Sequence, residues 1–248
     1  MSFLQNLASV VSLLETYRGR DRVIRFLTYA AMFMGSNGKT PAQIKWRTVV
    51  GELGACRVIL RLFDDLPMLL MNLSTGFGLK DKRPPIKLLN FLSALLNQGF
   101  YPSEHIAWLR QKKIISGEPR PYLLIGLFIW AASLTVELIK SLLKIHYINV
   151  QSVQLLKQKE LDKSSEGDDA SSSQNAEIKK TLSRLSNERR DIGLLMLQTC
   201  CDLTNAVSWL PPGLLWAGSL SPRANAVFGM FATVIMLYRN WPPPNKRG

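Results

Sequence analysis

The chain has 248 residues, and its 31 Lys and Arg against 18 Asp and Glu give a formal net charge of +13. Apolar residues make up 47% and charged residues 20%, which excludes an acidic disordered tail, a collagen and a disulfide scaffold. With two His and three Cys, the composition also argues against a His-rich metal site, most catalytic triads and a disulfide framework. The length fits one ordinary domain or a small integral membrane protein.

The N-terminal residues predict two amphipathic helices. Over residues 2–17 and again over 20–34, apolar side chains recur at helical spacing and form one stripe on each helix. The charged stretch YRGRDR, residues 17–22, joins the two stripes. The sequence leaves open whether this stretch is a kink or part of one continuous helix.

Residues 43–73 carry the most regular apolar pattern. The stripe consists of Val49, Leu53, Cys56, Leu60, Phe63, Pro67 and Leu70. Its alternating steps of four and three are typical of an amphipathic helix, which Pro67 is expected to end or bend. Arg57 and Arg61 flank the stripe. Such a basic helix either packs on neighbouring helices or lies among the headgroups of an anionic membrane, and both interpretations stay open.

Shorter elements follow in the rest of the basic N-terminal half. Residues 74–87 indicate a loop, and Phe91–Gln98 and Ser103–Lys113 indicate two short helices. Ser103 is expected to cap the second of these helices because it follows Pro102. Up to residue 120 the chain carries 17 basic against 8 acidic residues, a net of +9.

The first long apolar run predicts a membrane span over residues 121–143. The run is uncharged up to Val136, and it reaches the roughly 20 residues of a spanning helix only if Lys140 extends to the interface. A buried or interfacial helix is the alternative. The connector that follows, residues 144–206, has no net charge. It contains the low-complexity segment 161–176, predicted to be disordered, and then an amphipathic helix.

A second membrane segment is predicted over residues 207–241. Its uninterrupted apolar part covers residues 219–238, and residues 207–218 contain Pro-Pro-Gly, which indicates a re-entrant or interfacial segment. Trp and basic side chains at the ends of such segments lie at the headgroup level. The predicted membrane anchors are Lys140, Arg223, Arg239 and Trp241.

These assignments predict an all-α fold, a helical membrane protein with amphipathic N-terminal helices and two hydrophobic membrane segments. The predicted regions are a cytosolic amphipathic helical region (1–120), the first membrane span (121–143), the connector (144–206), the second membrane segment (207–241) and a cytosolic tail (242–248). Because Lys and Arg favour the cytosolic side, both termini are expected in the cytosol and the neutral connector across the membrane.

Motifs that would indicate chemistry are weak. GSNGKT, residues 35–40, has too few residues between its glycines for a phosphate-binding loop. Asp64 and Asp65 suggest a metal-binding pair, but ion pairing with Arg57 and Arg61 one turn earlier is the simpler account. We therefore expect no catalytic residue, metal or cofactor. The dispersed basic residues fit no nucleic-acid module, so the expected partner of the charge is an anionic phospholipid membrane.

Four blocks of sequence carry a family resemblance. They are LETYRGRDRVIRFLTY (14–29), CRVILRLFDDLPML (56–69), YPSEHIAWL (101–109) and NAVSWLPPGLLWAG (205–218). Together they resemble the peroxin-eleven family of peroxisomal membrane-elongation and proliferation proteins, with its gamma-type branch the nearest. The family-motif residues taken from these blocks are Tyr17, Arg18, Arg20, Asp21, Asp64, Asp65, Trp209 and Leu210.

The resemblance implies a non-enzymatic, multi-pass protein of the peroxisomal membrane with both termini in the cytosol. It implies that the protein remodels and elongates this membrane and so promotes peroxisome division and proliferation. Expected partners are further copies of the chain, related isoforms, and a dynamin-related fission GTPase with its membrane adaptors.

Members of the resembled family are credited with an amphipathic helix that inserts into lipid. Its nearest equivalent here lies within residues 43–73, and its predicted remodelling residues are Leu53, Arg57, Leu60, Arg61, Phe63 and Leu70. The alternative function is a peroxisomal pore or metabolite channel. In that case Glu137, Lys140 and Arg223 would line a polar path near the bilayer.

Overall fold

The computed structural model describes residues 3–36, 38, 40–164 and 169–242, with the backbone alone over 161–164 and 169–174. Within that part of the chain the regular structure consists of eight α-helices and no strand, which confirms the all-α prediction. The helices are α1 (Phe3–Glu15), α2 (Tyr17–Gly35), α3 (Pro41–Arg61), α4 (Asp65–Ser74), α5 (Pro84–Gln111), α6 (Arg120–Ser164), α7 (Asp169–Ser208) and α8 (Pro222–Arg239).

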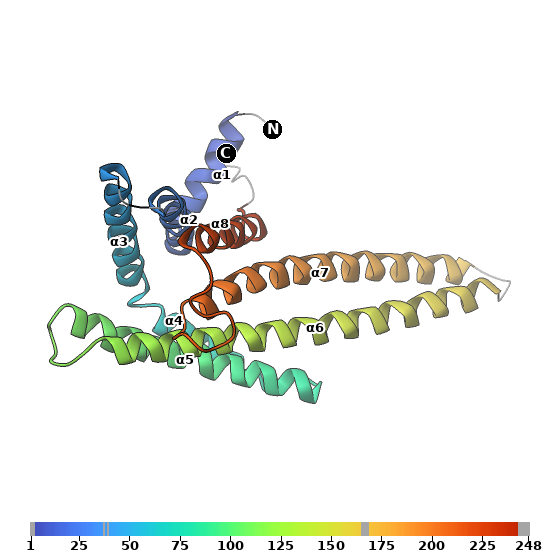
Figure 1. Cartoon of the computed structure of the whole chain (residues 1–248). Helices are drawn as coiled ribbons and strands as arrows, with labels where there is room; N and C mark the ends of the chain where they lie inside the picture. The colour runs from blue at the N-terminus through green and yellow to red at the C-terminus, as the bar shows by residue number, and fades with distance from the viewer. Residues whose placement is uncertain (1–2, 37, 39, 165–168, 243–248) are drawn as a thin grey trace.

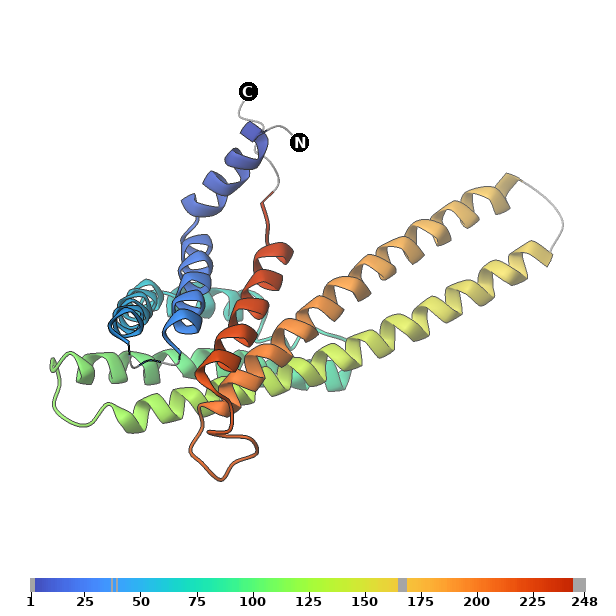
Figure 2. The same cartoon turned by 45° about the horizontal axis from the view of Figure 1, so that its top comes forward.

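The two longest helices, α6 and α7, form a hairpin that projects from the rest of the molecule (Figures 1 and 2). α5 lies against the first half of α6, while α8 packs between α7 and α2, and α3 packs on α2. The short helix α4 links the group of α1, α2, α3 and α8 to the layer of α5 and α6 (Figure 1). The N-terminal helices α1 to α3 thereby lie beside the end of the α6–α7 hairpin that is nearest to α8.

The charged stretch between the first two helices is a kink. α1 ends at Glu15, and Thr16 caps α2 by accepting a hydrogen bond from the Gly19 backbone N–H at 3.0 Å. The Thr16 hydroxyl also donates to the Leu13 carbonyl at 2.8 Å. A Cβ atom at position 19 would overlap that same carbonyl, so the kink requires the glycine of the YRGR motif.

The prediction of one helix over residues 43–73 is wrong, because the chain breaks between α3 and α4 at residues 62–64. Pro67 lies in the first turn of α4, where its missing N–H leaves no intrahelical hydrogen bond unmade. A continuous helix would instead press the proline ring against the carbonyl four residues earlier. The break places Phe63 and Leu70 on a different element from Leu53 and Leu60.

The prediction of two helices over residues 91–113 is also wrong, since α5 runs unbroken through Pro102. Ser103 is no N-cap, and its hydroxyl donates to the Phe100 carbonyl at 2.6 Å. α5 packs along α6 at this point, where Gly126 leaves room for the Ser103 side chain. We attribute the continuity to this packing, which outweighs the backbone hydrogen bond that proline cannot make.

One helix of the described residues, over positions 120–160, is long and apolar enough by composition to cross a membrane. Only 11% of its most apolar window is buried inside the chain, which distinguishes it from a soluble core helix. It includes the predicted span 121–143 but continues to Ser164. The extension follows from packing, because Ile148 of α6 is buried against Leu185 and Ile192 of α7.

The second predicted membrane segment, residues 207–241, is divided in the structure. α7 ends at Ser208, a loop follows, and α8 has 18 residues. The loop folds back on α7, since the Gly218 backbone N–H donates to the Ser208 carbonyl at 2.9 Å. This segment holds no helix among the described residues that meets the length and apolarity of a span. Arg223 and Asn225 in the first turn of α8 shorten its apolar stretch.

The segment predicted to be disordered, residues 161–176, differs from that prediction where the structure describes it. α6 continues to Ser164 and α7 begins at Asp169. Residues 165–168 lie outside the described residues. Helical propagation from two long, mutually packed helices accounts for the added turns.

Candidate functional site

Two ion pairs join the first three family blocks, and a third ties the first block to α7. Arg57 of α3 donates through Nε to Asp21 of α2 at 2.9 Å. Arg61, one turn later on α3, pairs with Glu104 of α5, with Nε 3.3 Å from Oε2. The third pair joins Arg25 of α2 to Asp202 of α7. We call these six residues the ion-pair network, and it connects four helices that are far apart in sequence.

The ion-pair network differs from the predicted pairing of Arg57 and Arg61 with Asp64 and Asp65, which is wrong. Asp65 instead accepts a hydrogen bond from the Leu66 backbone N–H at 2.9 Å. Asp64 lies in the break between α3 and α4 and lines a different cavity from Arg57 and Arg61. The prediction assumed one continuous helix, and the break at residues 62–64 removes the helical spacing on which it depended.

Burial controls the electrostatics of the ion-pair network. It raises the pKa of the Asp202 carboxyl above its usual value, although Arg25 opposes the shift. Burial also lowers the pKa of Arg57, which the attraction of Asp21 offsets only in part. For Arg61, burial acts in the same direction, but Glu104 more than compensates and the pKa is raised. All three arginines retain their charge at neutral pH.

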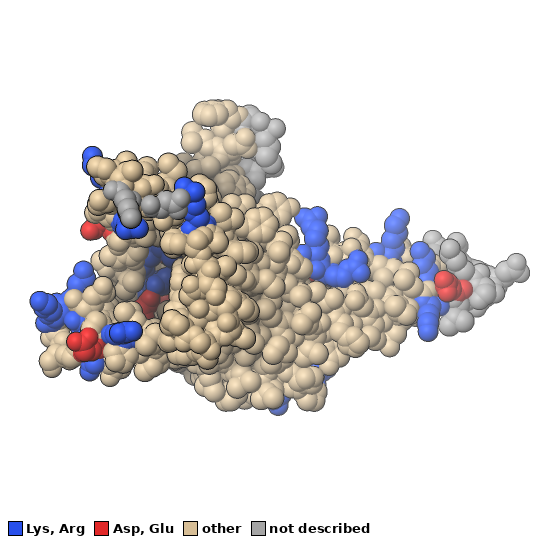
Figure 3. All heavy atoms as spheres, in the orientation of Figure 1, with Lys and Arg blue, Asp and Glu red and all other residues tan. Residues whose placement is uncertain are grey.

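A cavity of about 500 Å³ lies beside the ion-pair network and is lined by Arg25, Arg57, Arg61 and Glu104. Figure 3 shows a hollow on this side of the molecule in which atoms of both charge signs are visible. Its other wall is aromatic and includes Trp130 of α6 and the family-motif residue Trp209. These two rings stack with centroids 6.0 Å apart and planes at 28°, and the neighbouring Leu210 is buried. The fourth family block thus closes the same region.

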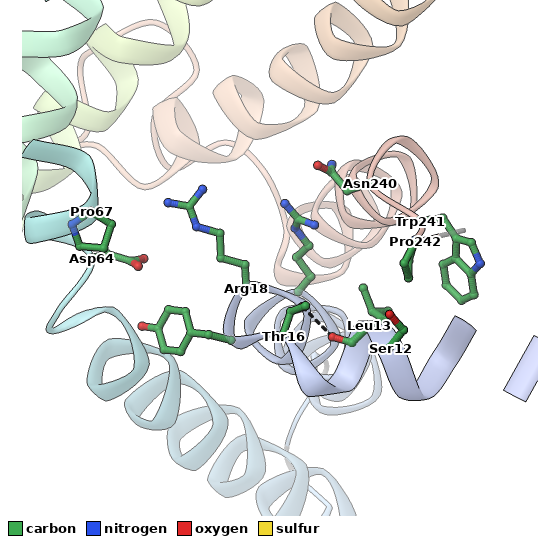
Figure 4. A pocket seen from close by; sticks show the side chains of 11 residues that line it. Ser12, Leu13, Thr16, Arg18, Asp64, Pro67, Asn240, Trp241 and Pro242 are labelled. Carbon is green, nitrogen blue, oxygen red and sulfur yellow. Dashed lines mark hydrogen bonds between the residues drawn. The ribbon is translucent and has the colours of Figure 1, made fainter. Parts of the chain in front are cut away.

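A second cavity, of about 640 Å³, lies where the α1–α2 kink, the α3–α4 break and the end of α8 meet (Figure 4). We call it the Arg18 cavity. Its charged lining consists of Arg18, Arg22 and Asp64. The remaining lining residues are Ser12, Leu13, Thr16, Tyr17, Pro67, Asn240, Trp241 and Pro242. Burial lowers the pKa of Arg22, and the neighbouring charge of Arg18 lowers it further.

Exposed apolar side chains gather on α4 and in the break before it. We call this group the α4 apolar surface, and it consists of Phe63, Leu66, Leu69, Leu70, Met71 and Leu73, all exposed. Phe63 and Leu70 are 76% and 70% exposed, whereas Leu53 and Leu60 of α3 are only partly so. The predicted remodelling residues therefore separate into two groups. Phe63 and Leu70 are exposed, whereas Arg57 and Arg61 pair with acidic side chains of α2 and α5.

The predicted membrane anchors contact other parts of the chain. Lys140 pairs with Glu137 on the same helix, facing a cavity shared with α4 and α5. Arg223 donates to the Ser36 hydroxyl at 2.8 Å, at the C-terminal end of α2. Arg223 of α8 thus contacts α2, whereas Glu137 and Lys140 contact each other on α6. These contacts give no support to a single polar path lined by all three.

Arg239 bears on the membrane topology. It binds Asp191 of α7 through two hydrogen bonds of 2.8 and 3.0 Å. The predicted topology places these two residues on opposite sides of the membrane. In this structure α8 therefore lies beside the second half of α7 at the same level.

Several residues that connect the helices were not found from the sequence. Arg25, Glu104 and Asp202 were not singled out as paired charges. A signal was present for Asp202, because an acidic residue amid the apolar side chains of a helix needs a buried counter-charge. Tyr29 and Gly229 were also missed, and the Tyr29 ring lies where a Cβ of residue 229 would stand. Of the other motif residues, Arg20 donates to the Leu14 carbonyl at 2.6 Å and so holds the kink.

An exposed apolar helix of spanning length, basic N-terminal helices and an exposed apolar patch define a helical membrane protein. The described residues contain no group of three or more His, Cys, Asp or Glu that could hold a metal ion. The model of the family Peroxisomal biogenesis factor 11 (PEX11) matches residues 7–241. The chain belongs to this family, which confirms the resemblance carried by the four sequence blocks, and it is a non-enzymatic peroxisomal membrane protein.

Two relatives match over nearly the whole chain. The human protein named Peroxisomal membrane protein 11C is 30% identical over 244 residues, which is 95% of each chain. The mouse protein of the same name is 32% identical over 243 residues, covering 95% of this chain and 93% of the relative. No solved structure matches the chain.

Proposed function

We propose that this protein remodels and elongates the peroxisomal membrane and so promotes peroxisome division and proliferation. Family membership supports a role in proliferation. The observation that carries the remodelling mechanism is the α4 apolar surface, which is exposed although the ion-pair network holds the preceding helix firmly. Exposed apolar patches mark sites of contact with another protein or with a membrane, and we assign this one to lipid.

The mechanism is a wedge. Full burial of a Leu or Phe side chain gains about 1.5–3 kcal/mol. Because Phe63 and Leu70 are 76% and 70% exposed, together they would gain about 2–4 kcal/mol on entering the acyl region. Insertion into one leaflet expands that leaflet and favours curvature. The ion-pair network ties α3 to α2 and α5, so a force on the inserted α4 would reach these helices as well. Self-association of many copies would raise the density of wedges.

The membrane arrangement belongs to this proposal. Residues 121–143 of α6 form the first membrane segment and residues 207–241 the second, with both termini in the cytosol. In support, Ser12 and Leu13 line the same cavity as Trp241 and Pro242, so both ends of the described chain lie together. Because Arg239 binds Asp191, insertion of α8 carries the second half of α7 with it or separates the two helices.

Protease protection of tags on intact peroxisomes tests this arrangement. Tags at both termini should be cleaved, and a tag near residue 168 should be protected. Cleavage of the tag near residue 168 would refute a lumenal connector. Protection of one terminus alone would refute the second membrane segment.

The proposed partners are those that the family resemblance implies. They are an anionic phospholipid membrane, further copies of this chain and related isoforms, and a dynamin-related fission GTPase with its adaptors. We assign the chain to the gamma-type branch, which is supported by the shared name of the two relatives at 30% and 32% identity. Co-purification from detergent of two differently tagged copies would test self-association.

The direct test of the wedge is Phe63→Glu with Leu70→Glu in the full chain, expressed in cells that lack the endogenous protein. We expect loss of peroxisome elongation, since two carboxylates oppose insertion into lipid. The matched control is Val153→Glu with Leu156→Glu, which places the same changes on exposed residues of the α6 connector. If the α4 variant elongates peroxisomes as well as the wild type does, or if the control fails equally, the wedge is wrong.

A further inference from the structure

We infer that the Arg18 cavity binds the phosphate group of an anionic phospholipid. The inference rests on the proposed function, because it names the lipid group that would hold α4 at the membrane. Arg18 and Arg22 are four residues apart on α2, and both line this cavity with the start of α4 and the end of α8 (Figure 4). The feature that needs explanation is a pair of arginines, one turn apart on α2, that line the same cavity.

Neither Arg18 nor Arg22 has a carboxylate within 4.0 Å among the described residues, whereas Arg25, Arg57 and Arg61 each have one. Like charges four residues apart on a helix repel and destabilise it by about 0.2–0.5 kcal/mol. A bound anion turns this repulsion into attraction. Guanidinium groups present a fork of N–H donors that matches phosphate oxygens, so a phosphate group suits this pair.

The rest of the lining limits the ligand. Asp64 contributes one negative charge, so the lining carries two positive charges and one negative charge, a net of +1. This net charge matches a phosphodiester that carries a single negative charge and disfavours the cationic headgroup of a choline lipid. The Thr16 hydroxyl is already engaged with the Leu13 carbonyl, as the dashed line in Figure 4 shows, so the two arginines remain the main donors.

The surroundings favour a lipid over a free phosphate ion. Asp64 and Pro67 of the cavity wall lie beside Phe63 and Leu66 in the chain, so a bound headgroup would place its acyl chains along the α4 apolar surface. Trp241 at the rim is 48% exposed, and Trp is enriched at the headgroup level of membranes. Free phosphate would use none of these apolar contacts.

The experiment uses the full chain purified in a neutral detergent and lipid retention measured by native mass spectrometry. The probes are phosphatidylinositol and phosphatidylcholine with identical acyl chains, and inorganic phosphate as a competitor. We expect retention of phosphatidylinositol over phosphatidylcholine. Arg18→Gln with Arg22→Gln should weaken it about tenfold or more, because charge-assisted hydrogen bonds are lost. Arg18→Lys with Arg22→Lys should show a smaller loss, since the charge stays but the fork is removed.

The matched control is Lys45→Gln with Arg47→Gln, which removes two charges from exposed positions on α3. Unchanged retention in this control supports the site, and an equal loss would overturn it in favour of net charge alone. Retention that survives Arg18→Gln with Arg22→Gln would also overturn it. Displacement by inorganic phosphate at the lipid's own concentration would overturn the lipid assignment. Unfolding curves taken in parallel identify a variant that has lost its fold. If the Gln variant has unfolded, the lipid retention of Arg18→Lys with Arg22→Lys decides the outcome, and retention equal to that of the wild type would overturn the site.

This result is separable from the wedge test. The variant Phe63→Glu with Leu70→Glu leaves both arginines in place and should keep its selectivity for phosphatidylinositol in detergent. Loss of elongation with headgroup selectivity intact would support the site while confirming the wedge. Loss of headgroup selectivity in this α4 variant would overturn the assignment of the phosphate to Arg18 and Arg22.

Discussion

Replacement of Asp202 by Asn removes the charge that faces Arg25 and keeps the size of the side chain. Arg25 is 9% exposed and Asp202 is 3% exposed, and the pair joins α2 to α7. The variant leaves a guanidinium group buried without its counter-charge. Removing one partner of a buried ion pair costs about 3–5 kcal/mol of the free energy of unfolding.

The loss is large enough to measure on the detergent-solubilised full chain. For a chain of this length about 1 kcal/mol lowers Tm by about 2–4 °C, so Tm should fall by roughly 6–20 °C. Thermal unfolding followed by circular dichroism at pH 7 provides the measurement. Glu188→Gln removes an exposed acid from the same helix and should change the free energy of unfolding by less than about 0.5 kcal/mol.

A double variant tests the reasoning more severely. Arg25→Met with Asp202→Asn leaves no charge buried at the site, so its loss should be smaller than the sum of the two single losses. Additive losses would show that the two side chains act independently. A Tm for Asp202→Asn within about 2 °C of the wild type would refute the buried ion pair itself.

Two further predictions concern packing and pH. Gly229→Val should lower the free energy of unfolding by about 1–3 kcal/mol, because its side chain would overlap the Tyr29 ring, whereas Gly193→Ala, with open space around it, should not destabilise the chain. Equal Tm values for the two variants would contradict this packing. For pH, hydrogen bonds from the Arg83 side chain and backbone lower the pKa of Asp81 from 3.8 to about 2. The folded pKa lies below the unfolded one, so this stability is present above pH 4 and is lost as the pH falls through the folded pKa of about 2. Asp81→Asn should cost about 0.5–1 kcal/mol at pH 7, since water screens the pair, and the difference from the wild type should shrink as the pH falls and vanish only below about pH 2. A difference that does not change with pH would count against it.

The element types were predictable because helical periodicity is local. The stripes over residues 2–17 and 20–34 predicted α1 and α2, and the apolar run from residue 121 predicted the helix of spanning length. The break at Thr16 was left open by the sequence, because it depends on a contact between the Leu13 carbonyl and Gly19.

The candidate site was predicted in its parts and missed in its connections. Phe63 and Leu70 were identified as lipid-contact residues, and the structure exposes both. Arg57 and Arg61 were recognised as important but were assigned the wrong partners, because the pairing was drawn along one helix. Their real partners lie 36 and 43 residues away in the chain.

Composition, charge and the spacing of apolar residues were enough to predict an all-helical membrane protein, since each is a property of residues close together in the chain. The PEX11 family was indicated by the resemblance of four short sequence blocks, which are also local. Only the tertiary structure decided that Pro102 lies within a continuous helix and that Asp202 neutralises Arg25 across a separation of 177 residues. It also placed Arg18 and Arg22 opposite the end of α8. Contacts of this kind arise from the packing of whole helices, which a local periodic pattern does not encode.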